Sequence, residues 1–188
     1  ELRCRVGSTP PVFARNLPAG THVFSVAGTT QIDASVVVKT YAPSTAPPNQ
    51  SCTTAPPLVP NTATTVVLSE QEDAIKNGCL PGGPNAAYEL ELAQPSDVLL
   101  VARFAQNDVG GVSLNRPACT MADLLECSTG ATPQRVSRRN LPAGSYRAVV
   151  ADEKGLTAEL MALVRPTVPP TVVSSDGCLD AQTIPETG

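Results

Sequence analysis

The sequence is poor in the side chains that most often carry chemistry. Its 188 residues include no tryptophan and a single histidine, His22, and aromatic residues make up only 3% of the chain. Hydrolysis by a serine or cysteine nucleophile needs a positioned general base, most often a histidine. A matching segment further along the chain has Tyr146 in place of His22, which favours a packing role for this position. We therefore predict that the protein is not an enzyme, and we assign no catalytic residue.

Charge and long apolar runs are also scarce. Charged residues account for 16% of the chain, and the net charge of −4 is scattered along it. The small basic cluster of Arg135, Arg138 and Arg139 is typical of a solvated strand face. Nucleic-acid-binding proteins carry a basic patch or stripe, so we expect no nucleic-acid partner. No apolar run approaches the ~20 residues that a membrane-spanning helix needs, so we expect no membrane span.

Proline and cysteine are better represented. The chain has 19 prolines, about twice the usual share of ~5%. Its six cysteines are Cys4, Cys52, Cys79, Cys119, Cys127 and Cys178. None of them forms the close Cys-x-x-Cys pair that zinc sites favour. Wide, irregular spacing is typical of disulfides, which persist in oxidising compartments. We therefore expect disulfide bonds and an extracellular or cell-surface location.

The sequence contains an internal repeat. Residues 12–20 read Val-Phe-Ala-Arg-Asn-Leu-Pro-Ala-Gly, and residues 136–144 read Val-Ser-Arg-Arg-Asn-Leu-Pro-Ala-Gly. The similarity continues downstream, where residues 32–40 match residues 156–164. Self-similarity at a fixed spacing indicates a repeat architecture.

Two cysteine matches give the boundaries of this repeat. Cys4 matches Cys127. Cys52 matches Cys178, and a Pro-Pro pair precedes both of these residues. The repeat is therefore about 125 residues long. We expect three parts: the C-terminal part of one repeat in 1–48, a complete repeat in 49–170, and the start of a following repeat in 171–188. The Pro- and Thr-rich stretches 42–62 and 165–175 are expected linkers, because proline favours extended, semi-rigid backbone.

The complete repeat is patterned as short strands divided by turn residues. Tyr88, Leu90 and Leu92 alternate with Glu89 and Glu91, which predicts one buried and one solvated face. The expected strands are 64–68, 88–92, 97–104, 109–114, 134–138, 145–150 and 156–164. Segments 69–77 and 156–163 also suit helices, but the counterpart of the second, 32–40, is rich in valine, so we predict strands for all three. Strands at this spacing indicate an antiparallel β-sandwich.

Several short motifs together resemble a known family. They are Tyr88-x-Leu-x-Leu, Pro95-Ser-Asp-Val-x-Leu, Val112-Ser-Leu, the Cys119 to Cys127 loop, and Leu141-Pro-Ala-Gly-x-Tyr146. This order resembles the bacterial pre-peptidase C-terminal domain and its tandem relatives in large secreted bacterial proteins. The resemblance implies an all-β fold of tandem antiparallel jelly-roll-like β-sandwich repeats joined by Pro/Thr-rich linkers. It also implies secretion, and a role in binding or spacing.

Some relatives in that family bind calcium through clustered acidic residues. The candidates here are Asp97 and Asp108, with Asp123 and Glu126 further away in the sequence. Calcium takes ~6–8 oxygen ligands, and these residues are spread out. We therefore expect no cofactor, with solvated acidic loop residues as the favoured interpretation and calcium as the alternative.

Within this family frame, the repeat phase suggests a pairing of the cysteines. We expect Cys52–Cys79 and Cys119–Cys127 inside the complete repeat, with Cys4–Cys52 as a rival pairing. Cys4 matches Cys127 and Cys178 matches Cys52. The expected partners of Cys4 and Cys178 therefore lie outside this chain. Each closed loop is expected to stabilise the fold by ~2–4 kcal/mol.

The expected linker also carries candidate glycosylation sites. Asn49-Gln-Ser51 is an N-glycosylation sequon. Serines and threonines among prolines are candidates for O-linked sugars. These are Ser44, Thr45, Thr53 and Thr54.

Two functions fit these patterns. The first is a structural or assembly repeat of a secreted or cell-surface bacterial protein, a building block of a stalk, fibre or surface filament. Its partners would be neighbouring repeats or identical subunits. The alternative is a non-catalytic module of a secreted hydrolase that binds an extracellular polysaccharide or protein. Such a module needs exposed aromatic rings or a calcium-built loop, and two of the three tyrosines lie in predicted strands.

Overall fold

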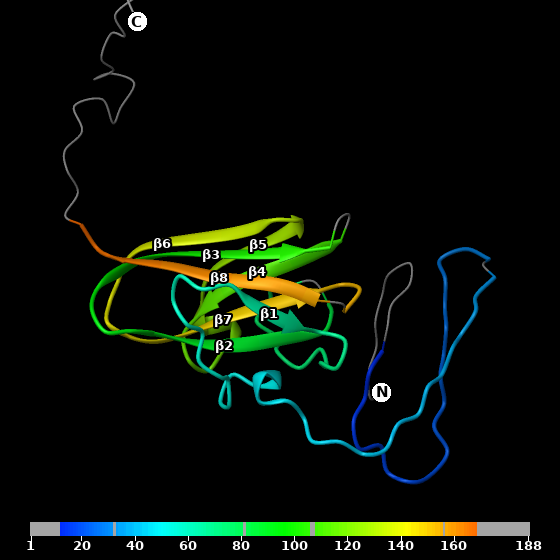
Figure 1. Ribbon diagram of the computed structural model, residues 1–188. Coiled ribbons are helices and arrows are strands. Elements are labelled where there is room, and N and C mark those ends of the chain that lie inside the picture. Colours follow the sequence, from blue (N-terminus) through cyan, green and yellow to red (C-terminus); the bar gives the residue numbers. More distant parts are fainter. Residues whose placement is uncertain (1–11, 32, 81, 106–107, 156, 169–188) are drawn as a thin grey trace, which may run out of the picture.

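The computed structural model describes residues 12–31, 33–80, 82–105, 108–155 and 157–168. Eight strands of this part of the chain form two four-stranded antiparallel sheets that pack face to face (Figure 1). They are β1 (Thr64–Val67), β2 (Asn85–Leu92), β3 (Ser96–Phe104), β4 (Val109–Asn115), β5 (Leu124–Ala131), β6 (Gln134–Leu141), β7 (Gly144–Asp152) and β8 (Thr157–Pro166). Two short 3-10 helices, η1 (Pro48–Gln50) and η2 (Met121–Asp123), lie in the connections.

The strand order is that of a jelly roll. The first sheet, called the β1 sheet here, has the order β1-β8-β3-β6, and the second, the β2 sheet, has the order β2-β7-β4-β5. Strand β4 pairs with β5, β3 with β6, β2 with β7 and β1 with β8. The chain therefore folds as one long hairpin rolled into two layers, as jelly rolls do. The predicted antiparallel sandwich is confirmed.

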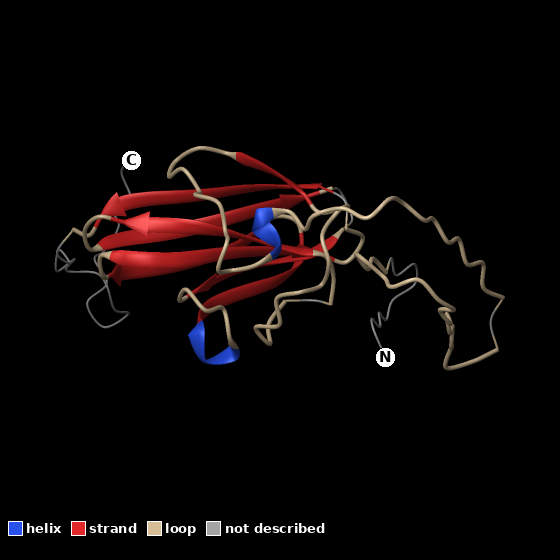
Figure 2. Cartoon of the chain, turned by 90° about the horizontal axis from the view of Figure 1, so that it is seen from below, coloured by secondary structure: helices blue, strands red, loops and turns tan. Residues whose placement is uncertain are grey.

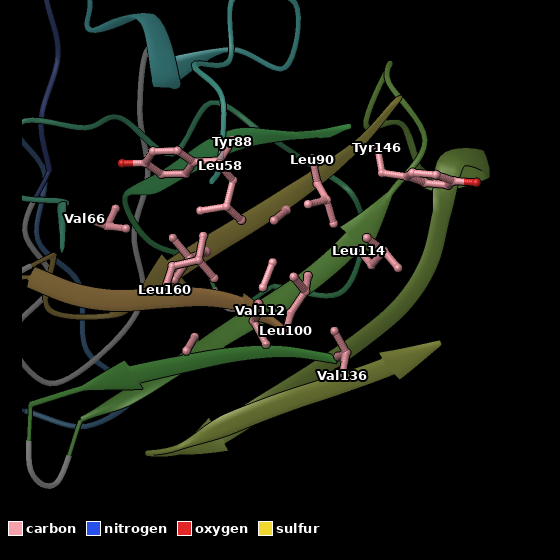
Figure 3. Close-up of a cluster of buried hydrophobic side chains, with 14 of the residues drawn as sticks. Leu58, Val66, Tyr88, Leu90, Leu100, Val112, Leu114, Val136, Tyr146 and Leu160 are labelled. Atoms are coloured by element: carbon pink, nitrogen blue, oxygen red, sulfur yellow. The ribbon is translucent and has the colours of Figure 1, made fainter. Parts of the chain in front are cut away.

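Leucine and valine fill the space between the sheets. Leu90, Leu100, Leu114 and Leu160 are fully buried, and they come from both layers (Figure 3). Two tyrosines, Tyr88 and Tyr146, pack at the ends of this core. Burying a leucine or valine side chain contributes ~1.5–3 kcal/mol, so a core with few aromatic rings can still hold the layers together.

The predicted strands of the complete repeat match β1 to β4 and β6 to β8, with ends that differ by a few residues. The largest difference at a start is in β2, which begins at Asn85. The alternation from Tyr88 to Leu92 is confirmed, with Tyr88, Leu90 and Leu92 buried and Glu91 exposed. The strand prediction for 156–164 is also confirmed over β8.

Two strand predictions are wrong. Residues 69–77 form a loop and pair with no strand of the described chain, because the backbone N–H groups of Glu72 and Ile75 donate to the side chains of Gln50 and Asn85. Residues 33–40 form no strand, and residues 12–31 and 33–46 run beside the sandwich as extended loops (Figures 1 and 2). A strand needs a hydrogen-bonded neighbour, and in the described chain no segment pairs with 33–40.

The expected linkers and boundaries are described in part. Residues 42–47 are extended, and η1 crosses the expected boundary between residues 48 and 49. Residues 165–166 instead complete β8. Segment 171–188, the expected start of a following repeat, lies outside the described residues. In the described part of the chain, no helix has the length and apolar character to cross a membrane.

Candidate functional site

The outer face of the β2 sheet is covered by two loops. We call it the loop-covered face, and define it by the side chains of this sheet that point away from the core: Ala87, Ser113, Asn115, Arg147 and Val149. The covering segments are 49–58 and 69–80 together with 82–84. Cys52 and Ile75 from these loops form a small apolar cluster with Ala87 and Val149 of the sheet. The β2 sheet is thus buried on both sides over part of its area.

Two disulfides fasten the covering loops. Cys52 is bonded to Cys119, with their Cα atoms 6.2 Å apart, and Cys79 is bonded to Cys127, with their Cα atoms 6.3 Å apart. The predicted pairs Cys52–Cys79 and Cys119–Cys127 are wrong, and so is the rival Cys4–Cys52.

The reason for the wrong pairing lies in the unpredicted strand β5. Cys127 stands in β5 opposite Ser113 of β4, whereas Cys119 lies in the connection between these strands. Cys52 of the first covering loop is bonded to Cys119 in the connection, and Cys79 of the second covering loop is bonded to Cys127 on the strand. Cys4 and Cys178, predicted to lack partners in this chain, lie outside the described residues.

Buried amide side chains hold the second loop in place. Asn85 of β2 donates to the carbonyl oxygens of Ile75 (3.2 Å) and Gly83 (3.3 Å), and it accepts from the backbone N–H of Ile75 (3.0 Å). Asn77 donates to Ser113 Oγ at 2.8 Å and to Asn115 Oδ1 at 3.3 Å. Because unpaired buried polar groups are costly, these bonds specify one position for the loop.

Arg147 of β7 ties the first loop to the sheet. Its Nε donates to the carbonyl oxygen of Cys52 at 2.7 Å, and its Nη1 donates to Ser145 Oγ at 2.8 Å. It also forms an ion pair with Glu89 of β2 at 3.0 Å. Only 10% of the Arg147 side chain is exposed, against 36% of that of Glu89. The guanidinium therefore lies under the loop, and the carboxylate lies at its rim.

Two groups at this rim have displaced pKa values. The hydrogen bond from Ser145 and the charge of Arg147 lower the pKa of Glu89 below its ordinary value. Burial raises the pKa of Tyr88, whose hydroxyl oxygen accepts a hydrogen bond from the Asn49 amide at 3.2 Å. Both shifts follow from fold contacts, since Glu89 has a positive partner and Tyr88 a shielded ring.

The calcium candidates Asp97 and Asp108 do not converge. They lie toward opposite ends of β3, and each is paired with a cation: Asp97 with Arg165 at 3.2 Å, and the buried Asp108 with Lys154. The pKa of Asp97 is lowered, first by the backbone N–H of Asn140 and then by Arg165. In the described ranges, no group of three or more His, Cys, Asp or Glu side chains could hold a metal ion.

The glycosylation candidates differ in accessibility. Asn49 is half-buried in η1, and its amide donates to Tyr88 and accepts from Gln71 at 2.8 Å. A glycan on this nitrogen would have to break the bond to Tyr88. The hydroxyl-bearing candidates Ser44, Thr45, Thr53 and Thr54 are all exposed.

An open groove of about 350 Å³ runs beside the edge of β2. It is lined by Pro57, Leu58, Val59, Pro60, Glu89 and Glu91. Its lining combines aliphatic side chains with two carboxylates and includes no aromatic ring. Sugar-binding faces commonly use aromatic rings as stacking surfaces, as single-stranded nucleic-acid sites do for bases, and this groove offers none.

The two sequence copies of the Leu-Pro-Ala-Gly turn share φ angles at two positions and one hydrogen bond. Asn16 and Asn140 both have φ of 51°, and the glycines that follow, Gly20 and Gly144, have φ of 152° and 144°. His22 Nε2 bonds to the carbonyl oxygen of Pro18 at 2.9 Å, as Tyr146 Oη does to that of Pro142 at 3.0 Å. In the first copy of the turn, His22 thus makes the hydrogen bond that Tyr146 makes in the second copy.

The first copy of this turn also contacts the sandwich. The backbone N–H of Arg15 donates to Glu72 Oε1 at 2.8 Å, and its guanidinium donates to the carbonyl oxygen of Glu70. The same guanidinium reaches Ser44 Oγ and lies 4.8 Å from the ring centroid of Phe13. The sequence patterns did not single out Arg15 or Arg147, because each acts across a long separation in the chain. They also missed Asn85, whose partners Ile75 and Gly83 lie in an irregular loop.

The chain matches no model of a known protein family, and no curated protein sequence is detectably similar to it.

Proposed function

We propose that this chain is a structural, assembly-forming repeat segment of a secreted or cell-surface bacterial protein. The disulfides and the loop-covered face support this role, because they stiffen a small sandwich that has few aromatic residues in its core. Disulfides of this kind persist in oxidising compartments. The role is a mechanical one, in which the sandwich serves as a spacer and contact unit, and no catalytic residue is proposed.

The observation that carries the proposal is the contact of Arg15 with the sandwich. The first copy of the turn donates from the backbone N–H of Arg15 to Glu72 Oε1 and from the Arg15 guanidinium to the carbonyl oxygen of Glu70. The connection that leads into η1, residues 42–47, is extended and includes Pro43 and Pro47. A stiff connection together with a side contact restricts the angle between neighbours. Restricted angles are what a stalk or filament needs and what a freely jointed binding module lacks.

Electron microscopy of the native secreted material tests this proposal. We expect filaments, stalks or ordered layers with a regular repeat along their length. Dispersed particles whose domains are freely jointed would contradict it. Retention of the full chain on chitin, cellulose or collagen, with no assembly seen, would favour the substrate-binding alternative instead.

A further inference from the structure

The segment after the first Leu-Pro-Ala-Gly turn has its apolar side chains in solvent. Phe24 is 62% exposed and Val26 58%, while their counterparts in the second copy, Ala148 and Val150, are fully buried. The turn that precedes them has closely similar φ angles at its asparagine and its glycine in both copies. The difference in burial therefore arises because, among the described residues, no strand pairs with the segment that follows the first turn.

The next stretch shows the same contrast. Val36 is 56% exposed and Val38 55%, whereas Leu160 and Ala162 of β8 are fully buried at the matching positions. The preceding residue, Ser35, matches Glu159, which faces solvent in β8. Residues 33–40 thus carry the alternation of β8, with an apolar face and a polar face, and lack a sheet to pack on.

The sandwich shows which strands such a segment requires. Strand β7 lies between β2 and β4, β8 lies between β1 and β3, and β6 pairs with β3. In the sandwich described here, strands β1 to β4 are already paired with its own β6, β7 and β8. A second folded copy has the same places filled. The apolar face of residues 22–31 and 33–40 therefore fits a partial sandwich that has counterparts of β1 to β5 and lacks those of β6, β7 and β8.

We propose that residues 12–40 complete a second jelly roll by pairing with a polypeptide segment of the same repeat type, equivalent to residues 49–123. The turn at residues 16–20 would then join counterparts of β6 and β7, and residues 33–40 would form the counterpart of β8. Backbone pairing of an added segment with an unfilled sheet is an established mode of recognition. This inference deepens the proposed function by naming the polypeptide that one repeat takes up.

A lengthened chain tests this pairing. A second copy of residues 49–123 is placed directly before Glu1 of the full chain, which restores the spacing of the complete repeat. Trypsin cleavage after Lys39 is the readout, since this bond lies in the segment expected to become a strand. We expect cleavage in the lengthened chain to be at least about 100-fold slower than in the original chain, because a paired strand must open before it is cut.

Two variants of the lengthened chain make the test specific. Val36→Asp places a carboxylate at the position that matches buried Leu160, and fast cleavage should return. Ser35→Glu introduces the residue that already stands at the matching position, Glu159, and cleavage should stay slow. The original sandwich in the same molecule reports that the protein is folded.

Equal cleavage rates in the lengthened and original chains would overturn the inference. So would slow cleavage of the original chain together with a dimer in sedimentation, since the partner would then be a second copy of this chain. The assembly test of the proposed function does not depend on this cleavage site, so either proposal can fail alone.

Discussion

At the scale of single residues, Arg147 does the most to join the covering loops to the sandwich. It bonds the carbonyl oxygen of Cys52 and pairs with Glu89, and its guanidinium is shielded by the loop above it. Hydrogen bonds to charged groups contribute more than neutral ones, and a buried group left without its partner is costly. The stability of the loop-covered face should therefore depend strongly on this one side chain.

We predict that Arg147→Ala lowers the free energy of unfolding by about 2–3 kcal/mol. The matched control is Arg103→Ala, which breaks an exposed pair with Glu159 at 3.6 Å. Exposed pairs contribute ~0–1 kcal/mol. Urea unfolding followed by circular dichroism measures both variants, and equal losses would show that Arg147 has no special part.

Acid should weaken the same face. The pKa of Glu89 is lowered in the folded protein, so the folded state favours the charged carboxylate. A carboxyl group with a lowered pKa contributes stability that is present above its unfolded pKa and is lost as the pH falls through its folded value. For glutamate this loss begins near the ordinary value of 4.5.

We expect the urea concentration at the unfolding midpoint of the original chain to decrease as the pH is lowered below about 4.5. In Glu89→Gln this decrease should be less steep. The carboxylates of Asp97 and Asp123 also have lowered pKa values and should retain part of the acid sensitivity in that variant. Identical pH profiles for the two proteins would remove Glu89 from this explanation.

At the scale of elements, alternation predicted the strands whose two faces differ clearly. Strand β2 is the best case, because its leucines face a core and Glu91 faces water. Strand β5 could not be predicted, since its residues Leu-Leu-Glu-Cys-Ser-Thr-Gly-Ala have no buried face and are mostly half-exposed along their length.

The unpredicted β5 also explains why the disulfide pairing was wrong. Without that strand, Cys119 and Cys127 look like the two ends of one loop. The actual bonds span 67 and 48 residues, and they depend on how the covering loops cross the sheet. Sequence spacing carries little information about contacts over such separations.

The pairing can be measured by non-reducing peptide mapping. Trypsin together with cleavage after Met121 separates the four cysteines of the sandwich into peptides 40–76, 77–103, 104–121 and 122–135. We expect the first to be linked to the third, and the second to the fourth. Linkage of the first to the second would restore the pairing expected from the repeat phase.

At the scale of the whole molecule, the described chain combines one eight-stranded sandwich with residues 12–31 and 33–46, which lie outside both sheets. The sequence repeat predicted the recurrence of the turn at Asn16 and Asn140, where φ is 51° in both copies. It did not predict that residues 33–40 would be unpaired, because apolar alternation describes which face a strand can bury. Whether that face is covered depends on the strands beside it.

Hydrogen exchange on the full chain, with its disulfides intact, tests the central claim most directly. Backbone amides of β3 and β7 lie in the middle of their sheets. They should exchange at least about 1000-fold more slowly than those of residues 33–40, because a paired strand exchanges only when it opens. Equal protection of residues 33–40 and β8 would contradict the claim that the chain carries one jelly roll beside a segment that matches β8 in sequence and lies in neither sheet.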